Sequence, residues 1–510
     1  MTARPTLSPA IVPSIAARSD TTLPTLEQLS LPERAVQFGT GALLRGLVDA
    51  LLDDANRQAR FGGRVVMIGS TGSGRDRALN DQSGLFTLVV QGLVNGESKR
   101  EFRVVSSVSR ALSATSEWNE VLRCAENPDL ELIFSNTTEI GIVLDETDAA
   151  GGGADVPPRS FPGKLTAFLL HRARSCAFDV ARAPVVIPTE LIEGNGDKLR
   201  DIVATLAARW SVEPAFAPWL AAVRFCNTLV DRIVPGAPNA AYAAELEQLL
   251  PYTDGMITVC EPYRLFAIEG DDALRQRLRF PVTDEGVIVA ESITPYRLRK
   301  VRLLNGAHTS FVSLAILAGC TTVREAVEHP ALGEFLRYVL MKEIVPSVDV
   351  PGAEAFAREV IDRFANPFLH HLLWDITLQG TTKFKVRVVP SILDFARRTG
   401  EAPRALALGL AGFLAFQDGS LQAKRRAVGE LVPADAAGDA LQARWHAVAD
   451  TPDAIGAFVR SVCADEALWG ADLTTVPGFA SLVTEFVIAI RTHGAVAAIG
   501  SLELKRVRAS

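Results

Sequence analysis

The sequence predicts an α/β fold in which an N-terminal domain with a mixed sheet is followed by a mostly α-helical C-terminal domain. In the first half of the chain, short β-branched runs alternate with helical patterns. A glycine-rich turn joins the first of these runs to the first helical pattern. After about residue 290 the chain becomes rich in alanine and leucine with helical periodicity. Its 510 residues exceed the size at which one hydrophobic core keeps growing, so two domains are expected.

Five short runs are the strand candidates: residues 35–38, 64–68, 102–105, 130–134 and 184–187. Amphipathic helices are expected from about residue 42 to 60 and from about 163 to 177. Residues 85–110 contain two successive β-branched runs that favour a hairpin, and this hairpin is why a mixed sheet is predicted. In the second half, helical patterns occupy residues 330–342, 353–364, 404–416 and 454–463.

The composition is that of a globular protein with a small-molecule substrate. Hydrophobic residues make up 48% and charged residues 22%, and the net charge of -7 argues against a nucleic-acid or anionic-membrane partner. Six widely spaced cysteines without C-x-x-C, and the lack of a signal or membrane-spanning segment, indicate a reduced cytoplasmic protein. Basic islands at residues 297–302 and 383–387 suit a small anionic substrate, although a solvated helix face is the commoner explanation.

Lys300, Asn305 and His308 stand at the start of an apolar run and are the catalytic candidates. On an ideal helix, Asn305 and His308 lie roughly 60° apart and Lys300 roughly 80° from His308, so all three can border one cavity. A desolvated lysine can exchange a proton near neutral pH, because burial penalises its ammonium form. An amide and an imidazole can hold the reacting oxygen by hydrogen bonds. The alternative is a basic, solvated helix start with His308 as a core histidine.

The turn after residues 35–38 could hold a dinucleotide pyrophosphate at a helix N-terminus. Its candidate cofactor-binding residues are Gly39, Thr40, Gly41, Leu43 and Arg45. The third glycine of the full G-x-G-x-x-G pattern is absent, because Leu44 stands in its place. A plain tight turn that requires glycine is an equally good explanation of the two glycines.

Two further loops could line the same cofactor. Ser70 and Thr71 follow the second strand candidate where an adenosine ribose would lie, and Arg75 could accept a 2′-phosphate, so NAD and NADP both stay open. A third loop, which contains Asn136, Thr137 and Thr138, could line the nicotinamide side or could cap a helix instead.

These patterns divide the chain into three segments. Residues 1–30 are expected to be flexible, because Pro, Ser and Thr are dense there and no apolar period appears. Residues 31–285 form a Rossmann-like dinucleotide-binding domain, and residues 286–510 form a helical substrate and catalytic domain.

From about residue 35 to about residue 400, the chain resembles the polyol-specific long-chain dehydrogenases of the mannitol dehydrogenase family, and most closely the branch that acts on uronates. The resemblance rests on these segments: Q-F-G-T-G-A-L-L-R at 37–45, S-N-T-T-E at 135–139, F-P-G-K-L-T-A at 161–167, E-L-I-E-G-N-G-D at 190–197, N-T-L-V-D-R-I-V at 227–234, K-V-R-L-L-N-G-A-H-T at 300–309, R-F-A-N-P at 363–367 and K-F-K-V-R-V-V-P-S at 383–391. It implies a cleft between the two domains, NAD as cofactor and no catalytic metal.

Residue by residue, the resemblance places Lys300 on the family's catalytic base, and Asn305 and His308 on residues that bind the reacting oxygen. Asp231 falls on a substrate-binding aspartate. One position departs, because Leu191 stands where mannitol-type enzymes have an asparagine that stabilises the oxyanion; the uronate branch resembles this chain better there. Asn195, with Glu190 upstream, is the polar candidate for the missing contact to the substrate.

The implied reaction is the NAD-dependent interconversion of a keto-uronate and a sugar acid, tagaturonate and NADH to altronate and NAD, with Lys300 as general acid and base. The substrate carboxylate needs cationic partners. Lys383, Lys385 and Arg387 alternate, so an extended segment would point all three to one face, although ordinary exposed charges are an equal alternative.

Other functions stay open at this point. Within the family, fructuronate reductase (mannonate oxidoreductase) and mannitol-type polyol dehydrogenase are alternatives. A metal hydrolase or isomerase would have to use His370, His371 and Asp375, of which only His371 and Asp375 share a helix face. A non-catalytic nucleotide-binding protein could have the same fold. Residue types alone determine neither the stereochemistry of the substrate nor the oligomeric state.

Overall fold

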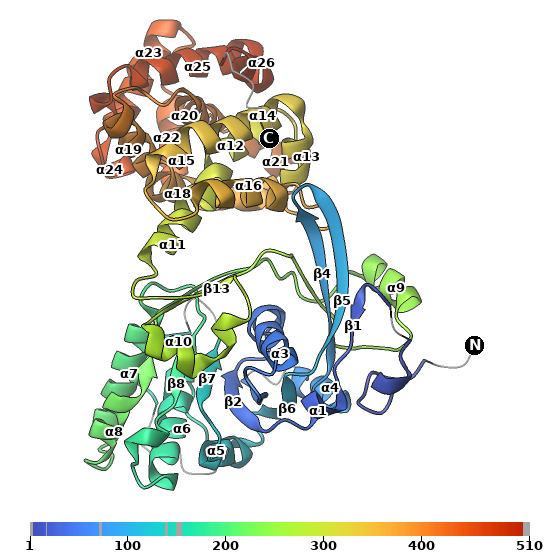
Figure 1. Ribbon diagram of the computed structural model, residues 1–510. Helices are drawn as coiled ribbons and strands as arrows, with labels where there is room; N and C mark the ends of the chain where they lie inside the picture. Colours follow the sequence, from blue (N-terminus) through green and yellow to red (C-terminus); the bar gives the residue numbers. More distant parts are fainter. Residues whose placement is uncertain (1–3, 17, 71–73, 138–140, 149–155, 503–510) are drawn as a thin grey trace. The chain divides into compact units, whose positions relative to one another are not determined.

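The computed structural model describes residues 4–16, 18–70, 74–137, 141–148 and 156–502. The chain divides into two compact units (Figure 1). The first unit is Met1–Gln91 with Ser98–Ile293, and the second unit is Gly92–Glu97 with Thr294–Ser510. The division near the middle of the chain therefore falls after Ile293, a few residues beyond position 285.

A parallel sheet forms the centre of the first unit. In the described part of the chain it has six strands in the order β6-β3-β2-β7-β8-β9, and every neighbouring pair is parallel. Its strands are β2 (Glu33–Phe38), β3 (Arg64–Gly69), β6 (Val108–Ser113), β7 (Leu132–Ser135), β8 (Val185–Pro188) and β9 (Arg224–Phe225). The strand order reverses between β2 and β7, and such a switch point is where open α/β sheets bind ligands.

The predicted hairpin lies outside this sheet, so the six-stranded sheet is parallel and the hairpin belongs to a separate sheet of the same unit. β4 (Phe86–Val94) and β5 (Glu97–Val105) are neighbours in a separate sheet of order β1-β5-β4-β11, with β1 (Thr21–Thr22) and β11 (Thr258–Cys260) at its edges. Asn95 and Gly96 join β4 to β5 with φ of 53° and 78°. So short a connection permits only an antiparallel pair, whereas the main sheet is built from longer crossovers. A third sheet has the order β10-β12-β13: β10 (Thr228–Asp231), β12 (Leu265–Glu269) and β13 (Val287–Ala290).

Helices pack on one face of the six-stranded sheet, as Figure 1 shows. They are α5 (Trp118–Glu126), α6 (Phe161–Ser175), α7 (Asn195–Arg209) and α8 (Phe216–Ala222). Because side chains alternate along a strand, Val36 and Phe38 of β2 face this core, whereas Ala35 faces the core that β10, β12 and β13 share with the first helix. The remaining short helices of this unit are η1 (Val12–Ser14), α1 (Leu26–Leu29), α4 (Arg75–Asp81), η3 (Val180–Arg182), α9 (Ala240–Leu249), α10 (Asp272–Leu278) and η4 (Phe280–Val282).

Residues 4–16 and 18–30 of the N-terminal segment pack against the second sheet, which differs from the expected flexibility. Leu7 and Val12 are buried beside Phe102 of β5. Thr25 begins α1 with a capping box. The apolar residues of this segment have no regular spacing, so periodicity did not reveal that they are buried.

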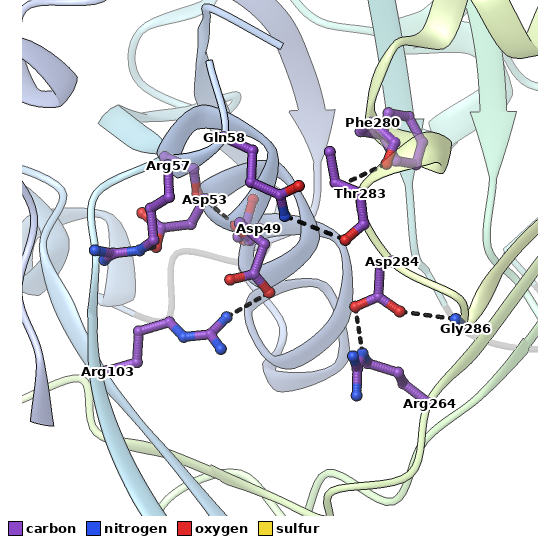
Figure 2. Close-up of polar contacts among 12 residues, drawn as sticks. Asp49, Asp53, Arg57, Gln58, Arg103, Arg264, Phe280, Thr283, Asp284 and Gly286 are labelled. Carbon is purple, nitrogen blue, oxygen red and sulfur yellow. Dashed lines mark hydrogen bonds and ion pairs between the residues drawn. The ribbon is translucent and has the colours of Figure 1, made fainter. Parts of the chain in front are cut away.

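The helix predicted after β2 is continuous but contains a π turn. It consists of α2 (Ala42–Leu44), η2 (Arg45–Asp49) and α3 (Ala50–Arg57). Polar contacts fix it within the unit (Figure 2). Asp53 Oδ1 accepts the backbone N–H of Ser106 at 2.8 Å, with its other oxygen held by Arg57 Nε of the same helix, and Gln58 Nε2 donates to the carbonyl of Thr283 at 3.2 Å. The orientation of the helix is therefore set from two sides.

Asp49 lies on this π turn and is fully buried. Its Oδ2 accepts a hydrogen bond from Gln37 Nε2 at 3.4 Å, whereas Asp49 Oδ1 and Gln37 Oε1 have no partner among the described residues. Burial raises the pKa of the Asp49 carboxyl from 3.8 to about 8. A proton on Asp49 would turn one of these two neighbouring acceptors into a donor.

We expect Asp49→Asn to flatten the pH dependence of stability. The folded protein holds a proton on Asp49 between about pH 4 and pH 8 that the unfolded chain releases, so this group's contribution to stability falls as pH rises through that window. Asparagine keeps the size of the neutral acid without titrating. Melting temperatures between about pH 6 and pH 8 should decline less for this variant than for wild type. Asp272 is exposed, and the control variant Asp272→Asn should keep the wild-type slope. If the melting temperature of Asp49→Asn falls with pH in parallel with wild type, the raised pKa of Asp49 is contradicted.

The second unit is mostly helical, and the helical patterns expected at 330–342, 353–364, 404–416 and 454–463 are confirmed. Its elements are α11 (Thr294–Arg299), η5 (Lys300–Asn305), α12 (Gly306–Leu317), α13 (Val323–Glu328), α14 (Pro330–Tyr338), η6 (Val339–Ile344), α15 (Val345–Ser347), α16 (Ala353–Phe364), α17 (Leu373–Ile376), α18 (Gly380–Arg387), α19 (Val389–Thr399), α20 (Arg404–Phe416), α21 (Ser420–Ala427), α22 (Ala436–Trp445), α23 (Pro452–Cys463), α24 (Glu466–Trp469), η7 (Leu473–Thr475), α25 (Phe479–His493) and α26 (Ala495–Gly500).

Close packing of α12 on α20 forms the core of this unit. A Cβ added at Gly409 would lie 2.7 Å from the carbonyl of Ser310, and one at Gly412 would lie 2.5 Å from Leu314. These two glycines therefore let α20 approach α12 closely. Within the described ranges, no helix is both long enough and apolar enough to cross a membrane.

Candidate active site

The glycine turn after β2 lies at the switch point of the parallel sheet. Gly39 has φ of +131°, and an added Cβ would lie 2.9 Å from the carbonyl oxygen of Asn136 and 3.0 Å from Leu44 Cδ1. The turn therefore requires glycine at this position. Gly41 begins α2, and a Cβ there would have no atom within 4 Å, so a ligand has room to approach this backbone. Leu44 fills the space above Gly39, which explains why the third glycine is absent.

Arg45, predicted to bind the cofactor, is buried and bonded within the protein. Its Nε donates to Thr258 Oγ1 at 2.9 Å, and its Nη1 donates to the carbonyl of Thr40. Burial lowers the pKa of Arg45 to about 10. Leu43 packs against the core on the same side of the sheet as the helix. Arg45 and Leu43 thus support the turn from behind, whereas Thr40 and Gly41 form its outer backbone.

Asn136 and Thr137 are fixed at the end of β7, beside the glycine turn. Asn136 donates its backbone N–H to the carbonyl of Phe38 at 3.2 Å, and its Nδ2 to Thr189 Oγ1 at 3.1 Å. The alternative of a helix cap at Asn136 or Thr138 depends on residues 138–140, which lie outside the described residues. Ser70 is exposed just after β3. Two other predicted cofactor contacts, Thr71 and Thr138, lie outside the described residues.

Glu190, named beside Asn195 as a polar candidate, lies at this edge of the sheet. It is buried, and its carboxylate accepts hydrogen bonds from Ser135 Oγ at 3.1 Å and from both the N–H and the Oγ1 of Thr137 at 3.0 Å. Burial raises its pKa, and these donors oppose the rise. Glu190 therefore holds together the loops that follow β7 and β8. In the sequence, Glu190 can be noticed as an acidic residue that follows the buried strand β8 (Val185–Pro188) almost directly.

Asn195 cannot bind substrate as predicted, because its side chain is fully buried and fully bonded. Nδ2 donates to Thr228 Oγ1 at 3.0 Å and to two carbonyls, and Oδ1 accepts the N–H groups of Thr228 and Gly196 at 2.9 Å each. The amide thus ties the start of α7 to β10. Asp231 is buried at the end of β10, and Leu191 is 58% exposed.

In the second unit, Lys300 and Asn305 stand at the two ends of the π turn η5, and His308 is one turn further on in α12. The wider turn changes the angles that an ideal helix would give, so the predicted 60° and 80° do not apply directly. All three side chains are partly buried. Gly306 allows close packing here, because an added Cβ would lie 3.0 Å from the carbonyl of Arg387.

His308 is held as a neutral, incompletely bonded imidazole. Its ring is stacked on Phe364 with centroids 3.7 Å apart, and the His371 ring meets it edge-on at 5.3 Å. His308 Nε2 is buried without a hydrogen-bond partner among the described residues. Burial lowers its pKa well below 6.5, and the nearby charges of Arg363 and Arg387 lower it further. An unpaired buried nitrogen of this kind is suited to a ligand oxygen.

The basic segment at 383–387 is helical, which corrects the prediction of an extended strand. Lys383 and Arg387 are four residues apart in α18 and share a face, and both depress the pKa of His308. Lys383 Nζ donates to the carbonyl of Ile376 at 3.0 Å, and Arg387 Nη1 lies 3.5 Å from Thr309 Oγ1. Lys385 instead donates to the carbonyl of Ala467 at 3.1 Å. Of the three cations, Lys383 and Arg387 therefore act electrostatically on His308.

The metal-binding alternative gains no support from the geometry. Throughout the ranges that the structure describes, no three His, Cys, Asp or Glu side chains gather as they would around a metal ion.

A parallel sheet with a glycine turn at its switch point, followed by a helical unit with lysine, asparagine and histidine candidates, is the arrangement expected of a two-domain dehydrogenase. Residues 33–282 match the model of the mannitol dehydrogenase Rossmann domain, and residues 292–491 match that of the mannitol dehydrogenase C-terminal domain. The chain belongs to the mannitol dehydrogenase family, as the resemblance predicted.

Relatives and solved structures agree with this assignment. The altronate oxidoreductase of Bacillus subtilis (strain 168) is 38% identical over 464 residues, which cover 91% of this chain and 94% of that protein. The altronate oxidoreductase of Halalkalibacterium halodurans is 39% identical over 456 residues, with 87% and 88% covered. Mannitol 2-dehydrogenase of Pseudomonas fluorescens, solved with NAD and D-mannitol, has a TM-score of 0.65 at 22% identity, covering 98% of this chain and 99% of its own. A substrate-free D-sorbitol dehydrogenase reaches 0.76 at 20% identity, with 97% and 100% covered. At this identity, the two structures show the fold.

Proposed function

We propose that this protein is an NAD-dependent oxidoreductase that interconverts tagaturonate and altronate in the cytoplasm. The observation that supports it most is the 38% to 39% identity, over most of the chain, to proteins named altronate oxidoreductase. The cytoplasmic location is supported by six cysteines that are all free, as expected in a reducing compartment.

The backbone of Thr40 and Gly41 would hold the pyrophosphate, with Ser70, Asn136 and Thr137 lining the rest of the dinucleotide. The open space at Gly41 and the N-terminus of the helix that follows fit this group. When bound, NAD supplies or accepts a hydride. Gly69 and Ser70 at the end of β3 provide no acid to select against a 2′-phosphate, so NADP is not excluded.

Lys300 is the proposed general acid and base. In the reducing direction its ammonium protonates the oxygen that becomes the hydroxyl, and in the oxidising direction its neutral amine removes that proton. Asn305 and His308 would donate hydrogen bonds to the same oxygen while charge develops on it. The unpaired Nε2 of His308 supports this role, because a neutral imidazole can donate from one nitrogen.

Lys383 and Arg387 are the proposed partners of the substrate carboxylate, since they are four residues apart on one face of α18 and both charges act on His308. Lys385 contacts Ala467 instead and is not proposed for this role. Asn195, the candidate for the contact missing at Leu191, is not proposed to bind substrate, because its amide is bonded within the protein. Asp231 stays a candidate for a substrate hydroxyl, as the family resemblance implies.

The test is a substrate panel that follows NADH and NADPH oxidation with tagaturonate, fructuronate and fructose. We expect tagaturonate with NADH to have the highest kcat/KM. Higher efficiency with fructuronate would indicate the mannonate-forming activity, and fructose used as well as tagaturonate would remove the reason for a carboxylate site. Binding of NADH without turnover of any member would favour a non-catalytic nucleotide-binding protein.

A further inference from the structure

The two cations proposed to bind the substrate carboxylate both belong to the short helix α18 of the second unit. Lys383 lines a cavity together with Thr309, the residue that follows His308 in α12. Arg387 Nη1 lies 3.5 Å from Thr309 Oγ1, and a Cβ added at Gly306 would lie 3.0 Å from the carbonyl oxygen of Arg387. A shift of α18 against α12 would therefore move both cations relative to His308.

The helix α18 does not fix its own first turn. Gln379 stands at its N-cap position with φ of 53° and ψ of 38°, and its side chain makes no capping hydrogen bond. Glutamine is uncommon in this left-handed region, so the surroundings must maintain this entry into the helix. A helix of eight residues is also too short to be stable by itself in water. The start of α18 therefore depends on partners from elsewhere in the unit.

Asp435 is the main partner of this first turn. Its Oδ2 accepts the backbone N–H and the Oγ1 hydroxyl of Thr381 at 2.8 Å each. Gln417 Nε2 donates to the same carboxylate oxygen at 3.4 Å, and the N–H of Gln379 donates to the carbonyl of Ala434 at 2.8 Å. A carboxylate at this end of a helix also suits the positive end of the helix dipole. Asp435 thus caps α18 from a segment that is distant in the sequence.

The carboxylate of Asp435 does not cap its own helix. Asp435 occupies the N-cap position of α22, which packs against α18 (Figure 1), but its side chain makes no capping hydrogen bond there. An aspartate at an N-cap usually accepts an N–H from the first turn of the helix that it begins. Glycines make room for the different orientation, because a Cβ at Gly380 would lie 3.3 Å from Asp435 Oδ2 and one at Gly438 would lie 2.7 Å from it. The carboxylate therefore fixes the helix that carries Lys383 and Arg387.

We propose that Asp435 is a positioning residue of the carboxylate site, because its cap on α18 holds Lys383 and Arg387 where they can meet the carboxylate of the sugar acid or keto-uronate. The proposal rests on the function proposed above. Asp435 acts through α18 and takes no part in proton or hydride transfer. Its removal should therefore weaken binding of the acid and leave the chemical step, which depends on Lys300, nearly unchanged.

The expected signature of this role is a rise in KM without an equal fall in kcat. Without its cap, α18 would let the two cations move away from the substrate carboxylate, which they bind equally in the ground state and in the transition state. A merely structural role of Asp435 would instead reduce the amount of folded enzyme. That loss would lower the apparent kcat and leave the KM for tagaturonate unchanged.

The experiment measures melting temperature, kcat and the KM values for tagaturonate and NADH in wild type, Asp435→Ala, Asp435→Asn and Asp439→Ala. We expect Asp435→Ala to raise the KM for tagaturonate about fivefold, the effect of one lost cap, with kcat and the KM for NADH changed less than about twofold. Asparagine caps a helix about as well as aspartate, so Asp435→Asn should keep the KM within about twofold of wild type. Asp439 is exposed in the first turn of α22 and is the matched control.

A wild-type KM in Asp435→Ala, or a fall in kcat without a rise in KM, would overturn the proposal. An equal rise in KM in the alanine and asparagine variants would overturn it as well, because the capping acceptor would then not be the cause.

Thr381→Val provides a second test, which holds even if Asp435→Ala fails to fold. Valine removes the hydroxyl that donates to Asp435. We expect the KM for tagaturonate to rise about two- to threefold, the effect of one lost hydrogen bond. Thr381→Ser keeps the hydroxyl, and Thr382→Val changes the exposed neighbour, so both should keep the wild-type KM. A wild-type KM in Thr381→Val would overturn the proposal.

The failure of this proposal differs from the failure of the proposed function. Wild type that reduces no keto-uronate would contradict the proposed function and the positioning role together. Wild type that reduces tagaturonate, with an unchanged KM in Asp435→Ala, would contradict the positioning role alone.

Discussion

Replacing Lys300 with alanine is expected to lower kcat for tagaturonate reduction by about 10²- to 10⁴-fold, the usual range for a lost general acid or base. The ammonium of Lys300 is the proposed proton donor to the nascent alkoxide, and alanine leaves only water for that step. The affinity for NADH should stay unchanged, because the proposed pyrophosphate site is the glycine turn of the first unit. Steady-state kinetics over a range of pH and titration of NADH fluorescence measure the two effects.

Two controls separate lost chemistry from lost structure. Lys342→Ala removes an exposed lysine from the other π turn of the second unit, η6, and should keep wild-type kcat. Added methylamine should restore part of the Lys300→Ala activity, since a free amine can carry the same proton. Near-wild-type kcat for Lys300→Ala at every pH would show that another group is the acid and base.

The sequence alone was sufficient to locate β2, β3, β7 and β8 of the parallel sheet and the glycine turn, because both depend on local patterns. Alternation of Val36 and Phe38 with Ala35 reports the two covered faces of a strand directly. Gly39 and Gly41 were recognised as a turn, but only the structure separates their roles: Gly39 meets Asn136 and Leu44, whereas Gly41 faces open space.

The basic segment at 383–387 was predicted to be extended, but it is helical because a residue distant in the sequence fixes the start of its helix. Alternating Lys383, Lys385 and Arg387 fit a strand as well as a short helix by local pattern. In the structure, Asp435 accepts the backbone N–H and the hydroxyl of Thr381 at 2.8 Å each and so fixes the first turn of α18. That partner lies 54 residues away, where no local pattern can reveal it.

Asn195 was also misassigned because its bonding partner lies far away in the sequence. The family resemblance around Leu191 suggested that Asn195 contacts the substrate, yet Thr228 of β10 bonds to both the nitrogen and the oxygen of its amide. The π turn at Lys300 and Asn305 is a third case, because the apolar period of 3.6 residues contains no sign of the wider turn. Residue types near the site were thus predictable, whereas their pairing required tertiary contacts.

His308→Ala is expected to lower kcat by about 10²- to 10³-fold, the loss typical of one oxyanion donor. Its stacking on Phe364 and the burial that lowers its pKa well below 6.5 indicate an imidazole that is neutral near neutral pH. The loss should therefore be the same at about pH 6 and at about pH 8, and wild type should show no kinetic pKa from His308.

Kinetics of His308→Ala, His308→Gln and His370→Ala across pH test this prediction. Glutamine keeps an N–H donor and should recover part of the activity, whereas the exposed His370 should be dispensable. NMR of the wild-type imidazoles supplies the direct measurement, because a neutral His308 keeps constant ring shifts down to about pH 6. A rate loss confined to low pH, together with a His308 resonance that titrates near its ordinary pKa of 6.5, would instead mean that the histidine acts as a cation. Such a result would contradict the structure, because burial and the neighbouring positive charges disfavour the protonated form of this ring.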